Sequence, residues 1–325
     1  MMTSYATHRL DGLEPDNLLA FMALLGLLRT LEEVTDWRPR VSWTVEKPPL
    51  RPALRVPQGV DHDAIVQSAA EGLDLLAQYH EFDGLADLTL PPENAARKLR
   101  EITSSTNQNR YIIDLWAALV SDAAISRDGE KVEPTPLCLM FGQGHQHFLK
   151  RLKSVPQQKT PPERGQRRSK ITVSEEDCLR EALFASWKRP DATPSFRWDP
   201  HEDVRYALRA HNPTDSKTKE TTQHGANRLA AVGLSLLTVA PRRRVGEVRL
   251  TVLGGQRESH GDFIFRWPIW RAPISLAAIR ALLNHPGLHS HNKLAALGVT
   301  EVRQARRIST GKFMNFTRAE PTISS

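Results

Sequence analysis

The sequence predicts an α+β fold: a helix-rich, two-lobed protein with short mixed or antiparallel sheets. Residues 16–34 give the strongest helix signal, because apolar side chains recur there at every third or fourth position. Residues 41–45 alternate between apolar and polar side chains, as a half-buried strand does. Such segments follow one another without the regular β-α-β order of a parallel sheet, which favours the α+β class.

The remaining elements follow from the same periodicities and from the turn residues between them. Strands are expected at 8–13, 53–56, 137–140, 247–253 and 262–267. We expect 53–56 to pair with 41–45, and 247–253 to pair with 262–267. Helices are expected at 63–79, 93–102, 109–124, a stretch ending at 152, 174–187, 226–237, 275–283 and 301–308. We place an N-terminal α+β lobe at 1–153, a basic mobile loop at 154–172 and a C-terminal α+β lobe at 173–325.

Positive charge is concentrated in one stretch of the chain. The 325 residues carry a formal net charge of +7 at pH 7, from 44 Lys and Arg against 37 Asp and Glu. Between His145 and Lys170 the only acid is Glu163, so the excess of this stretch equals that of the whole chain. Its cations are Lys150, Arg151, Lys153, Lys159, Arg164, Arg167, Arg168 and Lys170.

We interpret this basic run as the main candidate for nucleic-acid binding. Each Lys or Arg placed on a phosphate releases a condensed counterion, so a few contacts supply much of the affinity. Like charges at this density repel one another unless an anion neutralises them. The alternative interpretation is a solvated linker, since many charge runs have no ligand.

Other basic and polar groups are secondary candidates for the same contact. Three arginines after residue 300 have the spacing that places side chains on one face of a helix. Polar side chains can read base edges, and a helix N-terminus can hold a phosphate. The alternative interpretation is that these polar side chains cap helices and that the arginines lie on solvated faces. The secondary set is Asn107, Gln108, Asn109, Arg110, Gln143, His145, Arg242, Arg243, Arg244, Arg303, Arg306 and Arg307.

No motif in the sequence indicates a catalytic centre, a metal site or a cofactor. The Gly142-Gln143-Gly144 turn lacks the third glycine of a dinucleotide fingerprint, and GxxxxGK[ST] does not occur. Pro286 and Gly287 break the helix that would stack the nearby histidines, and mixed acid–base clusters are usually structural. The enzymatic alternative is a metal-dependent nuclease, for which the candidate residues are His285, His289, His291, Asp199 and Glu202.

Cysteine usage and hydropathy indicate the compartment. Cys138 and Cys178 lie far apart and form no CxxC pattern, which fits a reducing compartment. The most apolar run, 18–28, is too short to cross a bilayer and is typical of a buried helix. We therefore expect a soluble, cytoplasmic protein without a membrane partner.

Several segments together resemble the large-subunit-like CRISPR-associated proteins of type I effector complexes, in particular type I-G (formerly I-U). The segments are LDGLEPDNLLAF at 10–21 with LLGLLR at 24–29, FRWDP at 196–200 with YAL at 206–208, GANRLA at 225–230 with GL at 233–234, and WPIW at 267–270. The resemblance spans both ends of the chain, although the chain is shorter than those large subunits.

The resemblance implies a non-catalytic role in an RNA-guided surveillance complex of antiviral defence. Such a subunit contacts target DNA near the protospacer-adjacent motif, and its partners are the crRNA, the target DNA, other effector subunits and a separate helicase-nuclease. In such complexes base pairing reads the sequence, while the protein reads a short motif and the backbone. A structural adaptor that holds partner proteins is the second alternative to this function.

Overall fold

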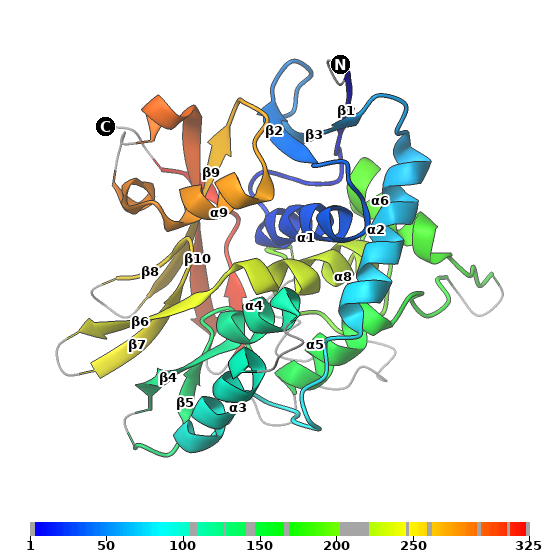
Figure 1. The fold of residues 1–325 in the computed structure, drawn as a ribbon. Helices are drawn as coiled ribbons and strands as arrows, with labels where there is room; N and C mark the ends of the chain where they lie inside the picture. The colour runs from blue at the N-terminus through cyan, green and yellow to red at the C-terminus, as the bar shows by residue number, and fades with distance from the viewer. Residues whose placement is uncertain are drawn as a thin grey trace.

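Helix α1 (Leu18–Val34) lies at the centre of the molecule in the computed structural model (Figure 1). Thirteen of its 17 residues are buried, and Asn17 caps its start by accepting a hydrogen bond from the backbone N–H of Ala20. The helix predicted at 16–34 is therefore confirmed. The structure describes residues 4–104, 109–126, 128–140, 147–165, 169–201, 221–244, 247–258, 262–290, 294–310 and 313–322.

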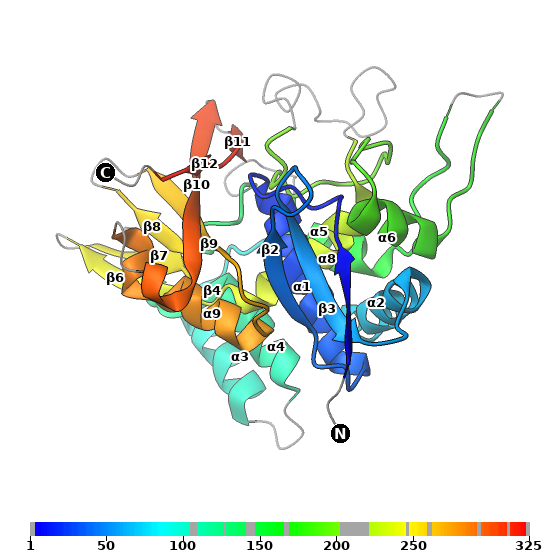
Figure 2. The ribbon, with the colours of Figure 1, turned by 90° about the horizontal axis from the view of Figure 1, so that it is seen from above.

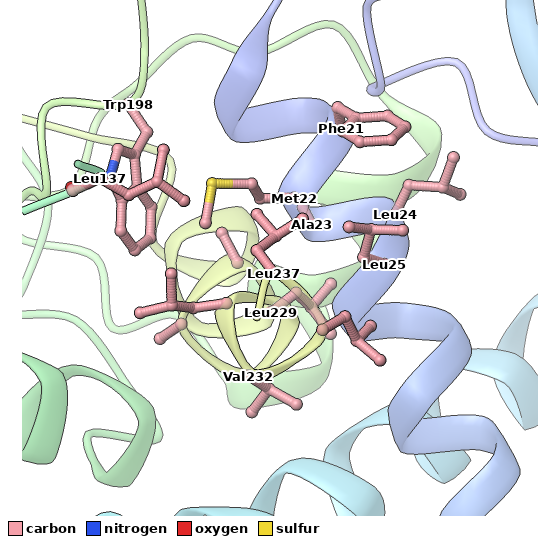
Figure 3. Close-up of a cluster of buried hydrophobic side chains, with 14 of the residues drawn as sticks. Phe21, Met22, Ala23, Leu24, Leu25, Leu137, Trp198, Leu229, Val232 and Leu237 are labelled. Atoms are coloured by element: carbon pink, nitrogen blue, oxygen red, sulfur yellow. The ribbon is translucent and has the colours of Figure 1, made fainter. Parts of the chain in front are cut away.

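Helix α8 (His224–Gly233) packs directly against α1. A Cβ atom on Gly26 would lie 1.8 Å from the carbonyl oxygen of Leu229, and one on Gly233 would lie 2.1 Å from that of Met22. Glycine at these positions lets the two backbones approach so closely. Figure 3 shows apolar side chains of both helices packed around this contact. One buried cluster thus joins residues from both of the predicted lobes.

The other helices lie around this pair. Helices α2, α5 and α6 lie on one side of α1 and α8, and the C-terminal strands lie on the other (Figures 1 and 2). Their bounds are α2 His62–Ala77, α3 Pro92–Ser104, α4 Arg110–Leu119, α5 Phe148–Gln157, α6 Glu175–Phe184 and α9 Leu276–Asn284. Short 3-10 helices occur at Leu234–Leu236, Pro286–His289 and Ala295–Leu297. Most of the predicted helices are confirmed to within a few residues.

All strand pairs among the described residues are antiparallel, and together with the helices they confirm the α+β class. Strands β1 (Tyr5–Arg9), β3 (Arg51–Pro57) and β2 (Arg40–Thr44) form one sheet in that order, with the predicted pairing of the last two. β4 (Val120–Ile125) pairs with β5 (Val132–Pro134), and β6 (Val239–Arg244) with β7 (Glu247–Val252). The C-terminal sheet has the order β11 (Phe313–Phe316), β10 (Val299–Thr310), β9 (Phe263–Trp270) and β8 (Gly255–Arg257), with β12 (Glu320–Pro321) also on β10.

The helix predicted at 301–308 is wrong, because these residues belong to strand β10. The segment becomes a strand because it has β9 and β11 as partners on its two edges. The pairing predicted between 247–253 and 262–267 is also wrong, since β7 pairs with β6 and β9 with β8 and β10. Nothing in the local pattern distinguishes these partners.

Two further predictions near the middle of the chain are wrong. The helix predicted at 109–124 ends at Leu119, where the chain continues directly into β4. No strand forms at 137–140, which make turns beneath Trp198. The indole N–H of Trp198 donates to the carbonyl oxygen of Leu137 at 2.9 Å, and both side chains lie in the core (Figure 3). Among the helices of the described residues, none is long and apolar enough to span a membrane.

Candidate nucleic-acid interface

Helix α5 carries the first cations of the basic run. Lys153 Nζ lies 2.6 Å from a carboxylate oxygen of Glu81. The guanidinium of Arg151 donates to the backbone oxygen of Ser195 at 2.6 Å. Lys150 is exposed and has no acidic partner among the described residues. Of these three predicted contacts, only Lys150 is left to meet a ligand without first giving up a partner within the chain.

The segment predicted as a loop, 154–172, begins in a helix, because α5 continues to Gln157. Further on, Arg164 and Ile171 exchange two backbone hydrogen bonds of 2.9 Å, so the chain returns on itself. Arg167 and Arg168 lie outside the described residues, between these two bridge positions.

Arg164 is a half-buried cation of the run that binds two acids. Its Nε and one terminal nitrogen donate to the two carboxylate oxygens of Asp191 at 2.6 and 3.1 Å, and its other terminal nitrogen lies 2.9 Å from Glu181. Asp191 is fully buried. Although burial acts to lower it, these hydrogen bonds raise the pKa of Arg164 above its ordinary value. A bidentate pair with a buried carboxylate fixes structure, and a phosphate would have to compete with Asp191 and Glu181 for this guanidinium.

The remaining described lysines of the run are paired as well. Lys159 forms an ion pair with Asp74 on α2 and lies 3.8 Å from Glu175 on α6. Lys170 Nζ lies 2.6 Å from Glu163. Acids from other parts of the chain therefore neutralise Lys153, Lys159 and Arg164, although the run itself contains a single acid. For these cations, the excess of charge along the sequence is not an excess in space.

A buried polar network beside this segment was not anticipated from the sequence. Arg228 on α8 is 1% exposed; it binds Glu175 at 2.5 Å and the carbonyl oxygen of Pro156 at 3.0 Å. The backbone N–H of His224 donates to Asp191, and its ring binds the carbonyl oxygen of Gln158. Burial lowers the pKa of His224 to about 4. The available signal was the polar start of an otherwise apolar helix, H-G-A-N-R at 224–228.

Asp199 is buried and paired with an arginine, so it is not exposed to a substrate. Its carboxylate accepts hydrogen bonds from Arg189 at 2.5 and 3.2 Å and from the Asn17 side chain at 3.0 Å. It is 1% exposed, and it joins the segment before α8 to the start of α1. Glu202, its proposed companion, lies outside the described residues. The sequence favoured ion pairing with the arginines at 197, 205 and 209 as the structural interpretation, and the described ion-pair partner is Arg189.

The polar cluster before α4 is described only in part. Asn109 caps α4 by accepting a hydrogen bond from the backbone N–H of Tyr111 at 2.7 Å. Arg110 lies 3.1 Å from Asp114, and its side chain is largely exposed. The cap therefore occupies the Asn109 oxygen that was proposed to read base edges. The other polar candidates, Asn107, Gln108, Gln143 and His145, lie outside the described residues.

The arginines of β10 do not share one face, because they lie on a strand. Side chains alternate along a strand, so Arg306 points away from Arg303 and Arg307. Arg303 forms an ion pair with Glu301. Arg306 lies 3.2 Å from Glu258 and 3.1 Å from Asp262. The single arginine face predicted for 303–307 is therefore wrong.

The β6–β7 hairpin carries the least neutralised arginines of the predicted set. Arg242 and Arg243 are exposed, and no carboxylate of the described side chains pairs with either. Adjacent residues of a strand point to opposite faces, so each face of the ribbon has one of them. Arg249 stands directly opposite Arg242 in the register and pairs with Glu133. Arg244 belongs to the same strand, but its side chain lies outside the described part.

The predicted histidine cluster binds protein groups. His285 accepts a hydrogen bond from the backbone N–H of Gly287 at 3.0 Å and caps a 3-10 helix. His289 Nδ1 lies 3.0 Å from the Arg266 guanidinium; burial, with Arg266 and Arg242 nearby, lowers its pKa to about 4. His291 lies outside the described residues. Within the described ranges, no three His, Cys, Asp or Glu side chains are grouped as a metal site requires.

Comparison with known proteins identifies no relative of the chain. No protein-family model, no curated protein and no solved structure matches the chain. The resemblance seen in the sequence therefore stays a prediction, and the case for function depends on the arginines of the β6–β7 hairpin.

Proposed function

We propose that the chain is a non-catalytic nucleic-acid-binding subunit, which meets phosphates through the β6–β7 hairpin. The observation that carries this proposal is the pair of exposed arginines, Arg242 and Arg243, without acidic partners among the described side chains. The main contact is thereby moved from the basic run at 150–170, whose described cations are mostly paired within the chain, to the hairpin.

The geometry of the hairpin suits a duplex. A two-stranded antiparallel ribbon fits the major groove of B-DNA, and several DNA-binding proteins use one. In Figures 1 and 2 the hairpin lies at the periphery, away from α1 and α8. Arg242 stands opposite Arg249 in the register, and Glu133 already neutralises Arg249, so Arg242 keeps a charge that a backbone phosphate would bind.

The resemblance to type I-G large-subunit-like proteins supports a more specific form of the proposal. In this form the chain acts in the cytoplasm, in an RNA-guided surveillance complex with crRNA and other effector subunits. It contacts target DNA near the protospacer-adjacent motif, and a separate helicase-nuclease cuts the DNA. A CRISPR array and effector genes beside its reading frame would support this form.

Salt dependence of DNA binding tests the proposal. The variant Arg242→Gln/Arg243→Gln should bind a 30-base-pair duplex more weakly than the unchanged chain. Its plot of log affinity against log salt should be shallower by up to about 2, because each lost phosphate contact removes about 0.9 from the slope. Fluorescence anisotropy between 50 and 300 mM KCl measures both quantities.

A matched control is Arg97→Gln/Arg100→Gln, which removes two exposed arginines from the surface of α3. The control has the same net charge as the hairpin variant, so a general electrostatic effect would lower the slope equally in both. Equal slopes in the hairpin variant and the unchanged chain would overturn the proposal. The same measurement on single-stranded DNA and on RNA identifies the preferred ligand.

A further inference from the structure

A row of alternating arginine and phenylalanine side chains crosses the C-terminal sheet at one end. Arg257 on β8 stands opposite Phe263 on β9, and Arg307 on β10 stands opposite Phe316 on β11. The β9–β10 register pairs Ile264 with Arg306, so Phe263 and Arg307 are the next residues along it. Directly opposite residues of antiparallel strands share a face. The order across the sheet is therefore Arg257, Phe263, Arg307, Phe316.

Side-chain contacts agree with this order. The guanidinium carbon of Arg307 lies 5.5 Å from the centre of the Phe263 ring, and the Phe263 and Phe316 rings are 6.2 Å apart, edge to face. Both phenylalanines are buried, whereas both arginines are half-buried. The Phe263 ring covers one side of the Arg307 guanidinium and keeps water from it.

Too little negative charge lies beside these arginines. The acid that acts on both arginines is Glu133, and its two oxygens are already used: one pairs with Arg249, and the other accepts from the backbone N–H of Leu250 at 3.0 Å. Arg257 and Arg307 bind only carbonyl oxygens among the described residues, those of Leu250 and Pro136, each at 3.1 Å. Arg249, Arg257 and Arg307 thus all lie near Glu133, and Asp262, the other acid that acts on Arg307, already pairs with Arg306.

The titration of the two side chains agrees with this arrangement. Burial and, next, the neighbouring Arg257 together lower the pKa of Arg307 to about 10, against opposing effects of Cys138, Glu133 and Asp262. Burial also lowers the pKa of Arg257, with Glu133 opposing and Arg249 adding to the shift. A cation that is partly withdrawn from water without an acid is stabilised when an anion joins it.

We propose that Arg257 and Arg307 form a binding site for a phosphate group, beside the rings of Phe263 and Phe316. Guanidinium groups bind phosphate through paired N–H donors, and each arginine still has terminal N–H groups that are not used by the contacts described. The shared ligand chemistry is a phosphate oxyanion. Its source is either free phosphate or a phosphate of the nucleic acid that the hairpin is proposed to hold.

Thermal unfolding of the whole chain in inorganic phosphate tests the site, with KCl added to keep the ionic strength constant. At a phosphate concentration ten times the dissociation constant, the folding equilibrium constant rises about elevenfold. In a chain of this size, that change raises Tm by roughly 2 to 4 °C. Arg307→Gln and Arg257→Gln should each lose most of this increase.

Two further variants keep the test interpretable. Arg306→Gln changes the neighbouring residue on the opposite face, where Glu258 and Asp262 already neutralise it, so its response to phosphate should equal that of the unchanged chain. Arg307→Lys retains the charge but loses the planar pair of donors, so it should respond more weakly than the unchanged chain and serves if Arg307→Gln does not fold.

A duplex-binding measurement then distinguishes the two sources. If the site holds a backbone phosphate, Arg307→Gln reduces the salt slope of duplex binding by about 1. If it holds free phosphate, Arg307→Gln loses the thermal response while its salt slope is unchanged. Both results support the site, and neither depends on the outcome of the Arg242→Gln/Arg243→Gln experiment. A Tm that phosphate raises equally in the unchanged chain, Arg257→Gln and Arg307→Gln, or does not raise at all, overturns it.

Discussion

Arg164 binds both carboxylate oxygens of Asp191, at 2.6 and 3.1 Å, and thereby connects the basic run to a fully buried acid near the start of α8. The sequence places Arg164 among eight cations with a single acid, where it looks available to a polyanion. The tertiary structure supplies the missing acid from 27 positions further along the chain. This pair predicts that Arg164 contributes to stability rather than to ligand binding.

We expect Arg164→Ala to lower the free energy of unfolding by roughly 3–5 kcal/mol, because it leaves a buried carboxylate without its partner. Urea unfolding followed by circular dichroism measures this change. Lys170→Ala is the control, since its pair with Glu163 is exposed and should contribute no more than about 1 kcal/mol. Equal losses in the two variants, or a shallower salt slope of DNA binding in Arg164→Ala alone, would contradict the structural role.

Gly26→Ala should destabilise the contact between α1 and α8. The added methyl group would lie 1.8 Å from the carbonyl oxygen of Leu229, so the two helices must separate, at a cost of about 3 kcal/mol or more. Gly59→Ala is the control: its left-handed conformation costs about 1–2 kcal/mol, but no atom lies within 4 Å of the new methyl group. A Gly26→Ala variant as stable as the control would show that the helices do not pack as closely as described.

Stability should fall as the pH is lowered from about 6.5 to about 4, in part because of His80. Burial lowers the pKa of His80 to about 4, while its ring binds the carbonyl oxygen of Leu152 and the hydroxyl of Tyr111. In this window the unfolded chain binds a proton at His80 and the folded chain does not. The free energy of unfolding therefore decreases by up to about 1.4 kcal/mol for each unit that the pH falls.

The variant His80→Gln should reduce this pH dependence by up to the same amount, although it also lowers stability at neutral pH. His224 has a pKa of about 4 for the same reason, so the double variant His80→Gln/His224→Gln should reduce the slope about twice as much. Chemical unfolding at half-unit steps of pH gives the slopes. An unchanged slope in both variants would place these histidines in contact with water.

Asn17→Ala should cost more than the loss of an ordinary helix cap. Asn17 caps α1 and also donates to the buried carboxylate of Asp199, so its removal costs about 1 kcal/mol for the cap and roughly 1–3 kcal/mol for the carboxylate. Asp61→Ala, which removes only the exposed cap of α2, should cost about 1 kcal/mol. Thermal or urea unfolding measures the loss of stability in each variant. Equal losses in Asn17→Ala and Asp61→Ala would show that the hydrogen bond from Asn17 to Asp199 contributes nothing to stability.

Several elements follow from local sequence alone. The apolar repeat of α1, the capping of α6 by Ser174 and the alternation of β2 and β3 all depend on residues within one element or one turn. These signals are local because a helix or a hairpin satisfies its backbone hydrogen bonds with near neighbours in the chain. The α+β class follows from such elements together, before any of their tertiary contacts is known.

The candidate sites are less accessible to sequence analysis, because they depend on contacts between distant residues. The charge of the basic run depends on acids from α2 and α6, and the position of Arg303, Arg306 and Arg307 depends on whether β9 and β11 are present as partners. The row formed by Arg257, Phe263, Arg307 and Phe316 comes from four different strands. No spacing within the sequence indicates that these four meet.

The sequence by itself determined the class of fold, its central helix and the excess of cations over acids. Only the tertiary structure decided which of the described cations lack an acid, and it is the basis for proposing the β6–β7 hairpin and the Arg257–Arg307 pair as binding sites. The physical reason is that the electrostatic energy of a charge depends on distance and burial in space, whereas a count along the chain records only neighbours in sequence.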